Sequence, residues 1–372
     1  MTATFSVVIV PCIGDEAGTG QAAQSAMRRL GMLVPLTAPP IHAVRALESQ
    51  ALTGLGCGAI GVFDDWRPEG YGAVPVTDGV PPNVASLVEV ARQAGLPILD
   101  GLRDSAHVSI PSIVRIHPGD EKGIEAAILA LAGSSTTVWL VVCETHHAER
   151  VLNPNALLVA THLLEVDSSG RPDWRRSLAY HIGHGQLWVN LRGREPEGVV
   201  RPGEEYDEVR QMVRALLAER LVDPGSGQLI AEVLLKEEVY EGRWLPTAPD
   251  LVVAPTRGYA FSPAAVAGHI EAEPVRGAEG TACRPGWWGV TGPAARREGA
   301  LPPVEITQIA PTLAAAFGLS LRSPVSGRIR KDLFSDEFWA GRPTSLPSRQ
   351  TGLTPTEEQL LTRRLQELGY IE

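Results

Sequence analysis

Short apolar runs alternate with helix-like segments along most of this chain, and this alternation limits its possible folds more than any other feature. The run 138–143 (VWLVVC) is the clearest of them. The runs 6–10 and 250–254 are also mostly apolar, and the run 6–10 ends at Pro11. Strands that are apolar on both faces are typical of the buried centre of a parallel sheet. We therefore expect an α/β protein whose mainly parallel central sheet has helices on both faces, with these three strands near its centre.

Helical spacing of apolar residues predicts four helices along the chain, at 84–94, 120–132, 204–221 and 306–317. One domain is expected to cover residues 1–339. The polar, Pro/Gly/Ser-containing stretch 340–353 is the predicted linker to a C-terminal docking helix at 354–372. That helix is expected to begin at Thr354-Pro355-Thr356-Glu357, which has the form of a capping box with proline at the first helical position.

The charge balance excludes several classes of partner. The 372 residues include 43 acidic and 33 basic side chains, a net charge of -10, so broad electrostatic binding to nucleic acid is not expected. No apolar run reaches the ~20 residues that span a bilayer, and the N-terminus has no basic region of a secretion signal, so we expect no membrane association and a cytoplasmic location. The oligomeric state is left open by the sequence.

Four cysteines are distributed along the chain without a Cys-x-x-Cys pair: Cys12, Cys57, Cys143 and Cys283. This spacing argues against a disulfide framework and against an all-cysteine zinc site. Free thiols in a reducing compartment are expected.

The segment 173–335 carries a resemblance to a known family. Its main phrases are Trp188–Gly198 (WVNLRGREPEG), Glu238-Val239-Tyr240 and Ala248–Val252 (APDLV). They are followed, in the family's order, by Gly280-Thr281, Gly292-Pro293, Ile309–Leu313, Gly318-Leu319 and Gly327-Arg328. With these motifs the chain resembles the type I phosphodiesterase/nucleotide pyrophosphatase family of the alkaline phosphatase superfamily, as a diverged member.

The resemblance implies a site at the carboxyl ends of the parallel strands, where two zinc-type ions and a Thr or Ser nucleophile act on a phosphoryl group. It places the nucleophile at Ser49, four residues before Thr53-Gly54, although a solvent-facing helical serine is the alternative. After the first strand it implies a metal-binding Asp, where this chain has Ile13. Asp15, two residues on, is the candidate substitute or else an ordinary turn residue.

The remaining implied metal ligands are only partly matched. A Ser-Asp-His-Gly motif is implied after the strand at 138–143, where the chain has Glu144 and His146 as candidate ligands of zinc or another divalent metal, or a plain polar loop. Cys283 stands closest to the last implied ligand, a histidine, and is otherwise a small buried residue. The family's Asp-x-x-x-His pair has no counterpart here.

Several other polar and aromatic residues are expected to be structural. His181 and His184 lie in a glycine-rich turn without a metal role. We expect Arg192, Arg194 and Glu195 to fix a sheet edge through ion pairs. Trp287-Trp288 is expected to fill a core, with base stacking as the alternative.

Three functions are compatible with these observations. The first is a family fold whose two-metal hydrolase activity is lost or reduced, with a cleft that binds a phosphorylated or nucleotide-like small molecule. The second is an active phosphoester hydrolase with a rebuilt metal site and Ser49 as nucleophile. The third is a structural or assembly partner of a family enzyme.

Overall fold

The protein is described by a computed structural model that covers residues 5–14, 19–41, 43–76, 84–101, 112–116, 123–131, 135–223, 225–261, 275–296, 301–321, 325–342 and 362. The predicted docking helix at 354–372 and most of the linker at 340–353 lie outside these residues, so both stay predictions. None of the helices in the described ranges is long and apolar enough to cross a bilayer.

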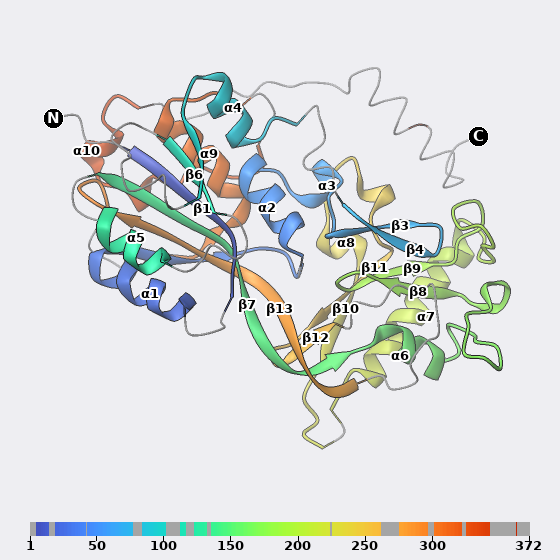
Figure 1. Ribbon diagram of the computed structural model, residues 1–372. Coiled ribbons are helices and arrows are strands. Elements are labelled where there is room, and N and C mark those ends of the chain that lie inside the picture. Colours follow the sequence, from blue (N-terminus) through green and yellow to red (C-terminus); the bar gives the residue numbers. More distant parts are fainter. Residues whose placement is uncertain are drawn as a thin grey trace.

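An eight-stranded sheet forms the larger part of the molecule (Figure 1). Its order is β14-β2-β13-β7-β1-β6-β5, and β12 pairs with β7. Strand β13 is antiparallel to β7 and β2, whereas the other pairs in the described part of the sheet are parallel. The bounds are β1 Phe5–Gly14, β2 Gly31–Thr37, β5 Ile98–Asp100, β6 Ser112–Arg115, β7 Thr136–Leu152, β12 Tyr259–Phe261, β13 Val275–Thr291 and β14 Val304–Glu305.

Helices cover both faces of this sheet, which confirms the predicted fold class. Alternate residues of β1 divide between the two layers, because successive side chains of a strand point to opposite faces. Val8 and Val10 pack with α1 (Thr19–Leu30) and α5 (Ile124–Leu131). Val7 and Ile9 pack with the helices of the other layer, α2 Val44–Thr53, α4 Leu87–Gln93 and α9 Ile309–Phe317.

Strand β1 is longer than its sequence pattern predicts. The strand was expected to end at Pro11, but it pairs with β7 as far as Gly14. The pairing with β6 stops at Ile9, so Pro11 lies where β1 is paired on one side only. A proline, which has no N–H to donate, is tolerated at such a position.

A second, antiparallel sheet has the order β10-β11-β9-β8, with a separate hairpin β3-β4 beside it (Figure 1). The predicted strand at 250–254 is β11 (Leu251–Pro255) of this smaller sheet, so its expected place at the centre of the main sheet is wrong. It is apolar on both faces because Leu251 and Val253 pack towards α7, whereas Val252 packs with Tyr240. The bounds here are β8 Ala179–Ile182, β9 Gln186–Val189, β10 Ala231–Leu235, β3 Trp66–Glu69, β4 Gly72–Pro75 and α7 Glu204–Arg220.

The other described helices are short. The four α-helices are α3 Cys57–Ile60, α6 Pro154–Ala160, α8 Lys236–Val239 and α10 Asp336–Trp339, and 3-10 turns lie at Trp174–Arg176, Leu245–Thr247, Ile306–Gln308 and Lys331–Leu333. The largest apolar cluster joins residues that are far apart in the sequence, from Phe5 to Trp339. Trp287 and Trp288 are 3% and 0% exposed, so they fill the core as expected.

Asp250 is the centre of a buried charge network that holds the smaller sheet. The side chain is 0% exposed, and Arg194 donates to both of its oxygens, at 3.0 and 2.6 Å. The Val189 amide also donates to it, at 2.7 Å. Burial opposes ionisation of Asp250, but the Arg194 charge prevails and lowers its pKa. Arg194 also pairs with Glu195 at 2.7 Å, and the buried Lys236 ammonium lies 3.8 Å from Asp250, so two carboxylates and two cations form the network.

The expectation for the arginines is thus confirmed for Arg194 and Glu195. Arg192 differs: it is exposed and donates to the carbonyl of Val199, at 3.2 Å, instead of to a carboxylate.

Replacing Arg194 by Met should lower the free energy of unfolding by about 3–5 kcal/mol, because the buried Glu195 loses its cation and Asp250 keeps only the more distant Lys236, at 3.8 Å. Urea unfolding measures this change. Arg192→Met, in the same phrase but exposed, should change stability by about 0.5 kcal/mol or less. Equal losses in the two variants would contradict the network described here.

Candidate functional site

Three cysteines come together near the carboxyl end of β1. Cys12 and Cys143 are directly paired in the parallel ladder of β1 and β7, and Cys283 lies opposite Thr145 in the antiparallel ladder of β7 and β13. Paired residues share a face, and residues two apart on a strand also share it. The three side chains therefore lie on the same face of the sheet, towards α2.

The three thiols are hydrogen-bonded to one another. Cys12, half-buried, accepts from Cys143 and Cys283, and these contacts lower its pKa. The same contacts, together with burial, raise the pKa of the other two thiols. The sequence did not predict this cluster, because more than a hundred residues separate each of these cysteines from the next one. The available signal was that each cysteine stands at or beside a position where the family resemblance implies a metal ligand.

The predicted metal ligands are divided between the two faces of the sheet. Glu144 alternates with Cys143 and so points to the opposite face, where its Oε1 accepts a hydrogen bond from Gln24 at 2.6 Å. His146 shares the parity of Glu144, whereas Cys283 lies on the other face. Asp15 lies outside the described residues. The three candidates that the structure describes therefore do not converge on one point, and the metal roles of all four stay predictions.

Ser49 lies inside α2. It is 7% exposed, and its carbonyl accepts the Thr53 hydroxyl at 2.7 Å. At 1.5 Å per residue, Ser49 is about 7 Å along the axis from the first residue of the helix. The Ser49 hydroxyl is therefore packed among side chains in the middle of the helix. It does not lie at the amino end, where the helix dipole is positive.

The amino end of α2 is occupied by a carboxylate of the chain itself. Asp65 Oδ1 accepts the amide of Arg45 at 2.7 Å. Burial raises the pKa of Asp65, and the amides of Arg45 and Val44 act against this rise. A helix amino end favours anions because its first N–H groups have no partner within the helix. Here Asp65 fills this position.

Asp64, next in the chain, fixes a histidine. Its Oδ1 accepts His184 Nδ1 at 2.9 Å and its Oδ2 accepts the His184 amide at 2.8 Å. Burial acts to lower the pKa of His184, but the Asp64 contact prevails and raises it. Gly183, at φ 59°, permits the approach, since a Cβ there would lie 2.9 Å from Asp64 Oδ2. The second histidine, His181, is fully buried, and burial lowers its pKa to about 3.

These contacts agree with the structural role expected for the glycine-rich turn. His181 Nε2 accepts the Gly185 amide at 3.1 Å, so this neutral ring is part of the turn itself. The pair of Asp64 and His184 was not predicted, because a contact between positions 64 and 184 depends on the tertiary fold.

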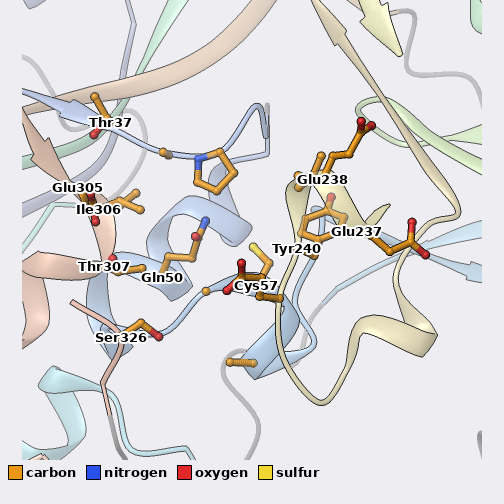
Figure 2. Close-up of a pocket in the computed structure, with 16 residues that line it drawn as sticks. Thr37, Gln50, Cys57, Glu237, Glu238, Tyr240, Glu305, Ile306, Thr307 and Ser326 are labelled. Atoms are coloured by element: carbon orange, nitrogen blue, oxygen red, sulfur yellow. The ribbon is translucent and has the colours of Figure 1, made fainter. Parts of the chain in front are cut away.

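A pocket of about 450 Å³ opens at the edge of the main sheet where its parallel strands end (Figure 2). It lies between the carboxyl ends of β2 and β14, at Thr37 and Glu305, and the segment that includes α8. Gln50 and Cys57 project between these walls (Figure 2). No lysine, arginine or histidine belongs to its described lining, which includes Glu237, Glu238, Glu241 and Glu305.

The donor set does not fit the two-zinc centre that the resemblance implies. Within the described ranges no group of three or more His, Cys, Asp and Glu side chains is arranged to hold a metal ion. The carboxylates are already bound within the protein, Glu144 by Gln24, Asp64 by His184 and Asp65 by Arg45.

No protein-family model matches this chain, and no curated protein matches it. Solved structures do match. Murine ectonucleotide pyrophosphatase / phosphodiesterase 5 has 12% sequence identity, a TM-score of 0.50, and coverage of 90% of this chain and 100% of that chain. The same values apply to the inactive murine protein in complex with AMP, and the human protein has 12% identity with a TM-score of 0.48, over the same shares of both chains. This chain therefore has the alkaline-phosphatase-like α/β fold seen in the murine nucleotide pyrophosphatase/phosphodiesterase.

Proposed function

We propose that this chain uses the phosphodiesterase fold to bind a small molecule and does not turn over simple phosphodiesters. The observation that carries the proposal is the contact of Asp65 with the first turn of α2. A phosphoryl group binds at a helix end through free N–H donors. Here the Arg45 N–H already donates to Asp65, so an approaching phosphoryl group would meet the Asp65 carboxylate instead. The anion site is thus filled from within the chain.

The side chains at the neighbouring strand ends support the same conclusion. Two-metal phosphoryl transfer depends on a set of oxygen and nitrogen ligands that hold both ions near the nucleophile. In this chain Ile13 is apolar and 1% exposed, and Glu144 points away from the thiols of the other face. Ser49, the nucleophile of the competing hydrolase hypothesis, is packed within α2.

The lining of the pocket indicates the class of ligand. Glu237 is paired with Arg210 at 2.8 Å and Glu238 with Arg214 at 3.1 Å, which leaves Glu241 and Glu305 without an ion pair among the described residues. This residual negative charge repels phosphate. Gln50 Oε1 is buried and has no hydrogen-bond partner in the described part of the chain, a situation that a donor from a ligand or water relieves.

These features favour an uncharged ligand with N–H donors, such as the nucleoside portion of a nucleotide-like molecule. The inactive murine neighbour was solved in complex with AMP. In this chain we propose that the base and sugar provide the binding energy and that the phosphate does not.

Hydrolysis of a nitrophenyl phosphodiester tests the loss of turnover. With zinc in excess, the purified protein should release nitrophenol no faster than zinc-containing buffer, because no residue set in the described ranges is arranged to activate the nucleophile and stabilise the developing charge. The proposal fails if zinc-dependent turnover is observed that Ser49→Ala abolishes and Ser86→Ala, a change at the α4 cap, leaves intact.

Isothermal titration with adenosine and AMP tests the ligand class. We expect adenosine to bind more tightly than AMP, and Gln50→Leu to weaken adenosine binding by roughly tenfold, the effect of about 1.4 kcal/mol. Gln93→Leu, an exposed glutamine of α4, is the matched control and should change nothing. Tighter binding of AMP, unaffected by Gln50→Leu, would show that a phosphate site elsewhere dominates.

A further inference from the structure

The cluster of Cys12, Cys143 and Cys283 combines three of the four cysteines of the chain, and none of the four forms a disulfide in this structure. Each comes from a different strand, and the three strands are consecutive in the sheet, in the order β13-β7-β1. The arrangement depends on ladder register, which is fixed over long stretches on both sides of β7. It is therefore a property of the central sheet and not of a loop.

The register selects one pair that can form a disulfide. Cys12 and Cys143 are direct partners on adjacent strands, which lie about 4.8 Å apart. A disulfide needs a Cα separation of about 4.4–6.8 Å. Cys283 is diagonal to Cys143, at about 7–8 Å, because its direct partner is Thr145. Cys12 and Cys283 are separated by the whole width of β7.

The environment distinguishes the attacking sulfur from the other two. Cys12 is half-buried, whereas Cys143 is 0% and Cys283 8% exposed. Cys12 is therefore the thiol of the three that an oxidant from solvent reaches most readily. A thiolate is the reactive form of cysteine towards oxidants and other sulfur atoms. Cys143, the most buried of the three, is its geometric partner.

We propose that Cys12 and Cys143 form a peroxide-reactive pair that closes to a disulfide between β1 and β7. The Cys12 thiolate attacks one oxygen of hydrogen peroxide. An S–O bond forms, the O–O bond breaks, and the departing hydroxide takes a proton to become water. Cys143 then loses its proton and its sulfur attacks the sulfenic sulfur, so that the S–S bond forms and the oxygen leaves as a second water molecule. The two thiols are oxidised by two electrons and one peroxide is reduced.

Cys283 is the third member of the cluster and stays outside the bond, because it lies diagonal to Cys143 and across β7 from Cys12. Cys57 provides a matched control, because it is equally buried but lies in a different apolar cluster, beside Tyr240 and Ala248. The inference does not depend on whether the protein hydrolyses phosphodiesters.

Titration of the native protein with hydrogen peroxide tests the pair. The number of thiols measured after denaturation should fall from four to two, with loss of two hydrogen atoms in the intact mass and a Cys12–Cys143 cross-link in the peptide map. Cys12→Ser should abolish the cross-link, and Cys57→Ser should leave it unchanged. Cys283→Ser should leave the same final bond.

Other outcomes would overturn the proposal. Four thiols that survive excess peroxide, a cross-link that includes Cys57, or a disulfide between two chains would each exclude the pair. Stoichiometric zinc that co-purifies with the thiols and protects them from peroxide would show a metal site in its place. Because Cys12→Ser changes a partly buried residue, circular dichroism of this variant must match that of the wild-type protein. If it does not, Cys12→Ala is used in the same comparison.

Discussion

Strand β7 is the element on which the rest of the structure depends. Its 17 residues pair with β1 on one side and with β13 on the other, and its far end also pairs with β12. The strand continues past the helical layers of the main sheet towards the smaller sheet (Figure 1). The two ladders fix which residues of three strands meet. They place Cys12 beside Cys143 and send Glu144 to the opposite face.

Internal pairing of charged groups supports the proposal that the site is not a phosphoryl-transfer centre. A buried carboxylate needs donors or a cation, and metal ions serve this purpose in many enzymes. Here the protein supplies the donors itself: Arg194 for Asp250, His184 for Asp64, and the α2 amide for Asp65. These three carboxylates are consequently satisfied within the fold. The proposed shift from hydrolysis to binding follows from this pairing.

The sequence predicted the layers better than the site. Apolar runs and helical spacing predicted the α/β class and helix α7 closely, because both patterns report local burial. The same apolar pattern misplaced 250–254, since a strand buried on both faces in a small antiparallel sheet has the same composition as one in a large parallel sheet. The thiol cluster and the contact of Asp65 with α2 depend on register and tertiary position, which no local pattern contains.

A crystal structure of the protein grown with zinc and orthovanadate, a mimic of the phosphoryl group in transfer, tests the central claim most directly. The account predicts that Asp65 stays on the Arg45 amide and that no vanadate lies at the amino end of α2. Vanadate bound at that position, with Asp65 displaced and zinc held beside it, would contradict the account and indicate an active phosphoryl-transfer site.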